Sequence, residues 1–195
     1  AQSYEYLDAK LKSKAATPDQ IETLKTRTFY GREKENLIYP IALSNLVLHG
    51  IDEPHLWHGN TLTGQETYGG LFQESPSQFD YILTNPPFGG KEGSEAQTRF
   101  AYKTSATQIL FLQHVIDSLT PGGICGIVLD EGVLFRTNKP AFMQTKRKLL
   151  DDCDLWAIVS LPGGVFNAAG AGVKTNLLFF TKGKPTQKIW YYDLS

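Results

Sequence analysis

One ten-residue segment, residues 79–88, constrains the fold of this chain more than any other. Its first six residues are mostly aromatic, aliphatic and β-branched, a composition typical of a buried strand. Asn85, Pro86 and Pro87 follow, and because proline fixes φ and lacks an N–H, the strand cannot continue as a central ladder strand. The segment therefore predicts a stiff turn at the carboxyl end of a buried strand, the edge where ligands bind in open α/β sheets.

The turn carries groups that suit a planar base with an exocyclic amine. The Asn85 side-chain oxygen and the Pro86 carbonyl are two acceptors that helix formation cannot consume. Such a pair suits the two N–H donors of an adenine amine. Phe88 offers an aromatic face on which a base can stack. The alternative interpretation is a proline-rich surface turn in which Phe88 belongs to the core.

Composition limits the partners that the chain can attract by charge alone. With 195 residues and 41% hydrophobic content, it can form one domain with a real core. Its formal net charge is −1, so no global basic field draws it to nucleic acid. If the chain acts on DNA, a partner or a local basic patch must supply much of the phosphate binding.

Cysteine and histidine usage favours a cytoplasmic protein without a metal site. Cys125 and Cys153 lie in apolar runs and form no metal-binding spacing, which indicates core thiols in a reducing compartment. The four histidines are too scattered to predict a metal centre, and we find no signal peptide or membrane-spanning run. The chain opens at Ala1 rather than Met, so we expect it to be part of a longer protein.

Hydrophobic periodicity predicts alternating helices and strands. Helices are expected over residues 3–16, 18–24, 37–49, 109–119 (with Ser105 as the cap) and 139–151. Strands are expected over residues 26–33, 55–62 (a short strand and its turn), 79–84, 124–129, 155–160, 175–181 and 188–192. The run at 120–123 is expected to end the preceding helix, and loops are expected at 63–78, 91–104 and 161–171. Strands separated by helices predict an α/β fold with a mostly parallel, doubly wound sheet.

Three further polar features have both a functional and a structural interpretation. Glu33 follows a predicted strand, where nucleotide-binding sheets hold ribose hydroxyls, but it is equally a solvated acid at a helix start. Asn60 could bind a ligand or simply close its turn. The cations at 146–148 are more typical of a solvated helix face than of a phosphate contact.

Several motifs occur in a fixed order around the Asn-Pro-Pro-Phe turn. They are residues 31–33 (GRE), 45–51 (NLVLHGI), 59–62 (GNTL), 129–135 (LDEGVLF), 161–166 (LPGGVF) and 172–176 (GVKTN). Together with the turn, they resemble the modification subunit of type I restriction systems, a group of amino-group DNA methyltransferases. The resemblance covers nearly the whole chain and implies a Rossmann-like fold that uses S-adenosylmethionine. Residues 1–195 would then form part of a methyltransferase catalytic domain.

The chain departs from the family pattern at three places. The Gly-rich cofactor loop of the type Asp-Pro-x-x-Gly-x-Gly-Gly is absent, so we expect the chain to begin just after it and to lack the first, central strand. Without that loop, these residues alone are expected to bind the cofactor weakly or not at all. Asn60 stands where the family usually has Asp, and Asp130 stands where it commonly has Pro.

The resemblance implies a role for each matching position in the target-base half of the site. Asn85, Pro86, Pro87 and Phe88 would form the catalytic tetrapeptide. Asn85 and the Pro86 carbonyl would accept from the target adenine N6, and Phe88 would stack on the flipped-out base. Phe166 would pack on its other side.

In the cofactor half, the resemblance assigns Glu33 to the ribose of S-adenosylmethionine and Asn60 to its adenine ring. It also implies that the chain acts on DNA beside a specificity subunit and a restriction subunit, in a hetero-oligomer. Two rival hypotheses stay open at this point. One is another amino methyltransferase that modifies protein glutamine or RNA, and the other is an inactive scaffold that docks a specificity subunit.

Overall fold

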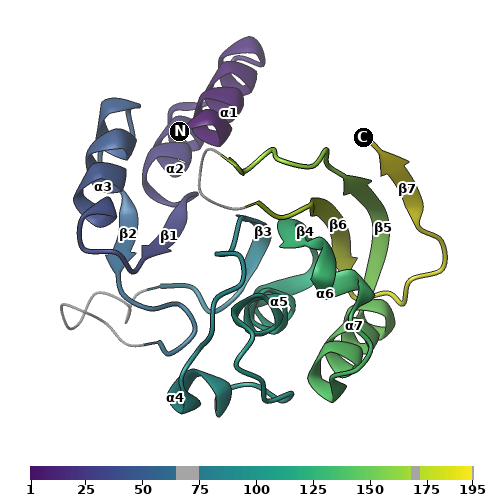
Figure 1. Cartoon of the computed structure of the whole chain (residues 1–195). Helices are drawn as coiled ribbons and strands as arrows, with labels where there is room; N and C mark the ends of the chain where they lie inside the picture. The colour runs from purple at the N-terminus through teal and green to yellow at the C-terminus, as the bar shows by residue number, and fades with distance from the viewer. Residues whose placement is uncertain (65–74, 168–171, 195) are drawn as a thin grey trace. The chain divides into compact units, whose positions relative to one another are not determined.

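The computed structural model describes residues 1–64, 75–167 and 172–194 (Figure 1). The chain divides into two compact units, residues 1–75 and residues 76–195.

The first unit contains three helices and a pair of strands. They are α1 (Gln2–Ser13), α2 (Pro18–Thr26), β1 (Tyr30–Glu33), α3 (Ile38–Leu48) and β2 (His55–His58). A capping box begins α2: Thr17 accepts from the backbone N–H of Gln20, whose side chain accepts in return from the Thr17 N–H. Strands β1 and β2 pair in parallel, with Glu33 opposite His58.

A small core holds this unit together. Tyr4, Leu24 and Ile51 are buried, and the Tyr4 ring meets Phe29 edge to face with 6.1 Å between ring centroids. Helix α3 is apolar but has no fully buried residue: Leu46 packs against this core, while Ile38, Ile41, Val47 and Leu48 are exposed. Gly50 ends α3 with a φ of 90°, in the left-handed region that favours glycine.

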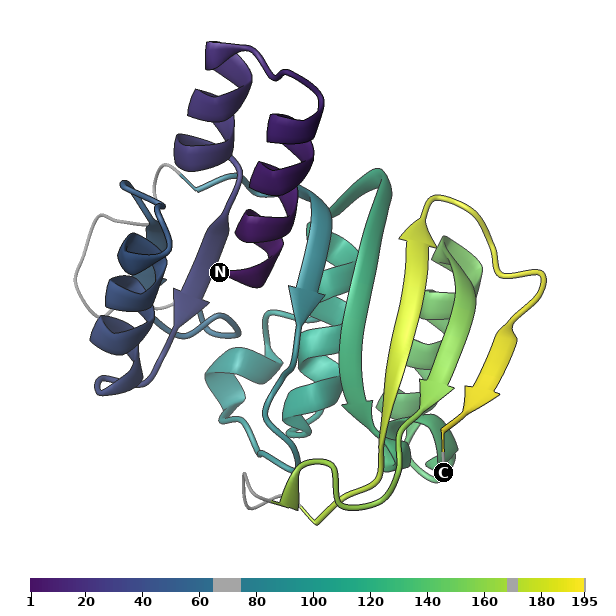
Figure 2. The same cartoon turned by 90° about the horizontal axis from the view of Figure 1, so that it is seen from above.

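The second unit is built on a five-stranded sheet of order β3-β4-β6-β5-β7 (Figure 2). Its elements are β3 (Phe79–Thr84), α4 (Ser94–Gln97), α5 (Thr107–Ser118), β4 (Leu119–Asp130), α6 (Glu131–Phe135), α7 (Pro140–Asp152), β5 (Cys153–Ser160), β6 (Thr175–Lys182) and β7 (Trp190–Asp193). Strand β6 runs antiparallel to both of its neighbours, while β3 with β4 and β5 with β7 pair in parallel. The predicted mixed α/β fold with mostly parallel strands is therefore confirmed.

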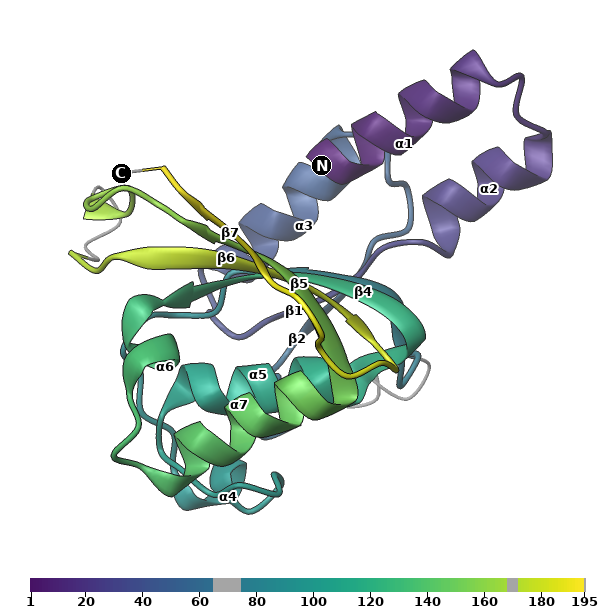
Figure 3. The ribbon, with the colours of Figure 1, turned by 90° about the vertical axis from the view of Figure 1, so that its right-hand side faces the viewer.

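Helices α5 and α7 cover one face of this sheet (Figure 3). Alternate residues of β4, among them Ile127 and Leu129, point into the same core as Ile116 of α5 and Leu149 of α7. Phe180 of the central strand β6 is fully buried there. Within the described residues, no helix is long and apolar enough to cross a membrane.

Strand β3 lies where the sequence predicts it, but the prediction that it is buried is wrong. It is the edge strand of its sheet, with Tyr81 and Leu83 exposed at 73% and 72%. The run at 120–123 follows the end of α5 at Ser118, as expected, but β4 begins at Leu119 rather than at residue 124 and passes through this run with a register irregularity opposite β3. Thr120 donates from its hydroxyl to the Asp80 carboxylate at 3.0 Å, a long-range bond that holds the segment on β3.

Two local predictions at loops also need correction. Helix α5 is capped at Ala106 rather than Ser105, and no side chain bonds to its first turn. The loop predicted over residues 91–104 contains the short helix α4. Most of the loop predicted at 63–78, and the end of the one at 161–171, lie outside the described residues.

Candidate functional site

The turn after β3 presents the two acceptors that its sequence predicts. The Asn85 side chain is exposed, Pro86 is buried and Phe88 is half-buried. Neither the Asn85 amide nor the Pro86 carbonyl has a hydrogen-bond partner among the described residues. Both groups are therefore free to accept from an incoming amine, since two consecutive prolines keep this backbone out of any ladder.

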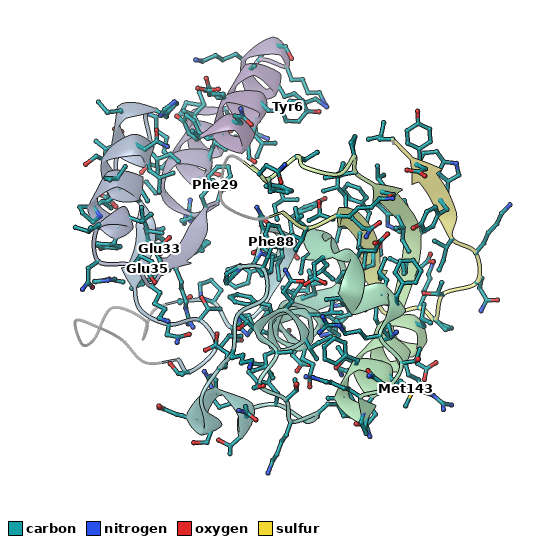
Figure 4. All side chains as sticks on the ribbon, viewed as in Figure 1. Tyr6, Phe29, Glu33, Glu35, Phe88 and Met143 are labelled. Carbon is teal, nitrogen blue, oxygen red and sulfur yellow. The ribbon has the colours of Figure 1, made fainter. Side chains whose placement is uncertain are left out.

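Phe88 and Phe166 lie against each other at the mouth of this turn. Their ring centroids are 5.2 Å apart and the ring planes are tilted by 54°. A base stacked between two rings would separate them by roughly 7 Å, two stacking distances of about 3.4 Å. The rings therefore contact each other now, and an entering base would replace that contact with its own faces. Figure 4 shows the position of Phe88.

The turn is fixed to the start of α5 by a short antiparallel bridge. The Gly90 carbonyl accepts from the Thr107 N–H at 3.1 Å, and the Ser105 carbonyl accepts from the Glu92 N–H at 2.8 Å. The Thr107 hydroxyl donates to the Glu92 carboxylate at 2.9 Å. A side chain on Gly90 would meet the Thr107 hydroxyl oxygen at 2.6 Å, so only glycine permits this close approach.

In the first unit, Glu33 and Asn60 lie at the same end of the β1–β2 pair. Glu33 is the register partner of His58, and its carbonyl accepts from the Gly59 N–H at 2.9 Å. One Glu33 carboxylate oxygen accepts from the Glu35 N–H at 2.7 Å, and the two residues are neighbours in Figure 4. The second oxygen has no partner among the described residues and can take a hydroxyl donor.

The Asn60 side-chain oxygen binds the backbone of its own turn rather than standing free for a ligand. Its side-chain oxygen accepts from the Leu62 N–H at 2.9 Å and lies 3.4 Å from the Thr63 N–H, so it closes its own turn. That bonding leaves the Asn60 side-chain N–H groups as the donors available for a ligand. The structure thus supports the turn-closing interpretation directly. In the ligand interpretation, Asn60 would have to donate hydrogen bonds to the ligand from its side-chain N–H groups, because its oxygen is already used.

Sequence reasoning missed Gln108, on the first turn of α5. It is 3% exposed, its side-chain oxygen accepts from the Asp130 N–H at 2.9 Å, and its side-chain nitrogen has no partner among the described residues. No local pattern singles out this glutamine, because its neighbour Asp130 lies 22 residues further along the chain. Of the three cations expected on a solvated face of α7, Arg147 and Lys148 pair with acids within or beside the helix. The Lys146 ammonium instead donates to the Leu134 and Arg136 carbonyls at 2.7 and 3.0 Å.

Comparison with known proteins identifies relatives of this arrangement. The N-6 DNA Methylase family model matches residues 8–195. The type I restriction enzyme EcoEI methylase subunit of Escherichia coli is 39% identical over 180 residues, which are 91% of this chain and 35% of that protein. The EcoKI methylase subunit of E. coli strain K12 is 38% identical over 177 residues, 86% of this chain and 32% of that protein. The chain thus spans about a third of the length of these curated relatives.

Solved structures agree with these relatives. The EcoKI M protein superposes with a TM-score of 0.81 at 34% identity, over 98% of this chain and 40% of that one. A chain from a study of complex assembly and conformational transition of the type I R-M system superposes with a TM-score of 0.86 at 40% identity, over all of this chain and 38% of that one. Because the family model covers almost every residue and relatives of 38–39% identity match most of the chain, the chain belongs to the N-6 DNA methylase family.

Proposed function

We propose that this chain is the catalytic part of a DNA adenine N6-methyltransferase that uses S-adenosylmethionine and works within a type I restriction-modification complex. The observation that carries the proposal is the pair of unpartnered acceptors, on Asn85 and Pro86, beside an aromatic ring at a strand end. Membership of the N-6 DNA methylase family supports it, as do the names of the similar methylase subunits.

The acceptors explain how the protein can make a poor nucleophile react. The lone pair of an aromatic amine is delocalised into the purine ring. Hydrogen bonds from its two N–H groups to Asn85 and the Pro86 carbonyl favour a pyramidal nitrogen with a localised lone pair. Holding that nitrogen in line with the methyl group can lower the barrier by roughly 7–11 kcal/mol, as effective molarities for well-oriented reactants indicate. The main catalytic task of these residues is therefore alignment.

The aromatic rings supply part of the free energy that extrudes the base. Taking a base out of a duplex costs about a few kcal/mol, and stacking on an aromatic side chain returns about 1–3 kcal/mol. Phe88 offers one face to the base. Phe166, whose ring contacts Phe88, is positioned to offer the other once the two rings separate.

The first unit has residues that fit one part of the cofactor. The unpartnered Glu33 carboxylate oxygen suits a ribose hydroxyl, and the Asn60 amide N–H groups suit a ring nitrogen of adenine. Bound there, S-adenosylmethionine supplies a methyl group that its sulfonium already activates. Residues 1–195 would serve as part of a methyltransferase catalytic domain.

The near-neutral net charge of the chain supports a complex in which other subunits bind much of the DNA. A chain with a net charge of −1 does not attract a whole duplex by itself, so partner subunits would supply much of the DNA binding. In the proposed complex, a specificity subunit reads the DNA sequence and a restriction subunit carries the cleavage activity. DNA and these two subunits are the partners that we propose.

The test removes one acceptor and leaves the fold intact. The variant Asn85→Ala, made in the full chain with its partner subunits, should lose N6-methyladenine formation on DNA while its thermal unfolding stays unchanged, because Asn85 is exposed and unbonded. Gln187→Ala, which removes another exposed amide of the same unit, serves as the matched control and should keep activity. The assay follows methyl incorporation into DNA, RNA and protein separately. Normal N6-methyladenine formation by Asn85→Ala, or methyl transfer to RNA or protein alone, contradicts the proposal.

A further inference from the structure

A small pocket opens directly behind the Asn-Pro-Pro-Phe turn. Gly89 and Gly90 line one side, the first turn of α5 lines a second, and the segment from Asp130 to Phe142 lines a third. Its volume is about 120 Å³, room for roughly four water molecules. Pockets for drug-sized ligands are roughly 300–1,000 Å³, so this one suits a compact group rather than a base.

A buried donor lies at the wall of this pocket. The Gln108 side chain is 3% exposed and belongs to a residue that lines the pocket, and its oxygen is held by the Asp130 N–H at 2.9 Å. That bond fixes the orientation of the amide, and no described residue accepts from its N–H groups. Because a buried, unpartnered N–H group is costly, an acceptor from a ligand is the expected partner.

Two helices begin at the same pocket with uncapped N-termini. Residues of the first turn of α5 and of the first turn of α7 both line it, and neither helix has a side-chain cap. Several first-turn N–H groups already donate to the Gly90, Ala106 and Lys139 carbonyls, but the N-terminus of a helix also carries a partial positive charge that favours anions. Helices of 12 and 13 residues are long enough for this effect.

The charges at the pocket have the same sign as the helix ends. Lys91, Arg136 and Lys139 line it, and none forms an ion pair with a described residue. Asp130 is the one carboxylate among the described lining residues, and it already accepts from the Val133 N–H at 3.1 Å.

The position of two of these cations is set by one aromatic ring. The Arg136 guanidinium and the Lys139 ammonium lie 5.8 Å and 6.0 Å from the centroid of the Phe142 ring, which is itself buried at the pocket. By contrast, Arg147 and Lys148, further along α7, are paired with acids. Among the described residues, Arg136 and Lys139 are therefore unpaired at the pocket, while these two cations of α7 are neutralised by acids.

We propose that this pocket binds one backbone phosphate of the nucleic-acid strand that carries the target base. This inference rests on the proposed function and adds a site to it. Gly90 is two residues from Phe88, a span of at most roughly 7 Å of chain. A base stacked on Phe88 and an oxyanion held by Gln108, Arg136 and Lys139 would thus belong to neighbouring positions of one strand. The pocket is the local basic site that a chain of net charge −1 needs.

The test pairs protein variants with single neutral phosphates in the DNA. In the full chain with its partner subunits, Gln108→Glu keeps the oxygen that Asp130 contacts and replaces the donor with a negative oxygen. The double variant Arg136→Gln/Lys139→Gln changes only exposed side chains and covers the case in which Gln108→Glu does not fold. Arg147→Gln, an exposed α7 cation paired with Asp151, is the matched control.

DNA affinity is measured by fluorescence anisotropy over a range of salt concentrations. We expect each pocket variant to bind DNA about tenfold more weakly and to reduce the salt slope by about one, with the control unchanged. A methylphosphonate that neutralises one phosphate beside the target adenine should weaken the wild type similarly but leave the pocket variants little affected, because the two changes remove the same contact.

Three outcomes overturn the proposal. One is an unchanged salt slope, and a second is a methylphosphonate loss that adds fully to the variant loss at every flanking phosphate. The third combines two results: inorganic phosphate raises the wild-type melting temperature, and the affinity loss caused by each methylphosphonate is the same in the wild type and in the pocket variants. That combination would assign the pocket to a free oxyanion. Methyl transfer is assayed in parallel. If the methylphosphonate and the pocket variants affect the same contact but no N6-methyladenine forms, only the proposed function is refuted. If N6-methyladenine forms but the two changes act independently, only the phosphate site is refuted.

Discussion

The contact between Gly90 and Thr107 allows the positioning of the catalytic turn to be tested quantitatively. In Gly90→Ala the new Cβ would lie 2.6 Å from the Thr107 hydroxyl oxygen and 3.2 Å from its Cβ. Thr107 is 1% exposed, is stiff at χ1 because it is β-branched, and is bonded to Glu92 at 2.9 Å. It cannot turn away without losing that bond, so the turn and the start of α5 must move apart.

The magnitude follows from two opposing effects. Overpacking a well-packed site costs about 1–3 kcal/mol, and replacing glycine restricts the unfolded chain, which returns about 0.4–1 kcal/mol. We expect Gly90→Ala to lower the free energy of unfolding by about 1–2 kcal/mol, a fall of roughly 2–8 °C in melting temperature. A displacement of the turn by a few tenths of an ångström should reduce kcat several-fold, since a shift of about 1 Å can cost roughly 10²-fold.

The matched control is Gly93→Ala in the same loop. A side chain there meets nothing within 4 Å, and its φ of −69° suits alanine. Its melting temperature and kcat should stay close to those of the wild type. Adding Thr107→Ala to Gly90→Ala should recover part of the loss, and the double-mutant cycle should give a coupling energy of about 0.5–3 kcal/mol. Equal melting temperatures and equal kcat for Gly90→Ala and Gly93→Ala would refute the reasoning.

Three further predictions use other parts of the chain. Phe88→Ala should weaken binding of DNA with an intact target adenine by about 1–3 kcal/mol in a titration. Binding of DNA with an abasic target should not change, because the variant loses only base stacking. Equal losses of affinity on both DNAs would contradict this prediction. Glu33→Gln keeps the oxygen that accepts from the Glu35 N–H, so the melting temperature and kcat should change little. It removes the negative charge of the other oxygen, so KM for S-adenosylmethionine should rise about tenfold. An unchanged KM would argue against the ribose contact. Burial raises the pKa of the Cys153 thiol to about 11 and also raises the pKa of the Cys125 thiol. Neither thiol should therefore react with iodoacetamide at about pH 8 in the native protein. The free energy of unfolding should fall as pH rises through the ordinary thiol pKa, because only the unfolded thiols ionise there. Rapid native labelling followed by mass spectrometry, or stability that rises above pH 9, would contradict the last prediction.

Local physical chemistry determined most of the elements. The Thr17-Pro18-Asp19-Gln20 run forms a capping box at the start of a predicted helix, because its hydrogen bonds join residues only three apart. The strand at 79–84 ends where Asn85 and two prolines follow, because proline geometry acts on its immediate neighbours. For the same reason the acceptors on Asn85 and Pro86 could be expected from the sequence alone.

Long-range contacts overruled the sequence where local signals were strong. The Thr120-Pro121-Gly122-Gly123 run is typical of a turn, yet it lies within β4, because Thr120 bonds to Asp80 forty residues away. Strand β3 has the composition of a buried strand, yet the sheet order places it at an edge. Asn60 was open between two roles, and the bond to the Leu62 N–H shows that its oxygen closes the turn.

The sequence by itself thus determined the order of helices and strands, the stiff turn at Asn85 and the family to which its motifs belong. Only the tertiary structure decided which side chains meet around that turn. It brings Phe166 against Phe88, buries the Gln108 amide beside a pocket without a described partner for its nitrogen, and leaves Arg136 and Lys139 unpaired while pairing Arg147. The physical reason is that backbone preferences act over a few residues, whereas the partner and burial of a side chain depend on segments that the topology brings together from far apart in the chain.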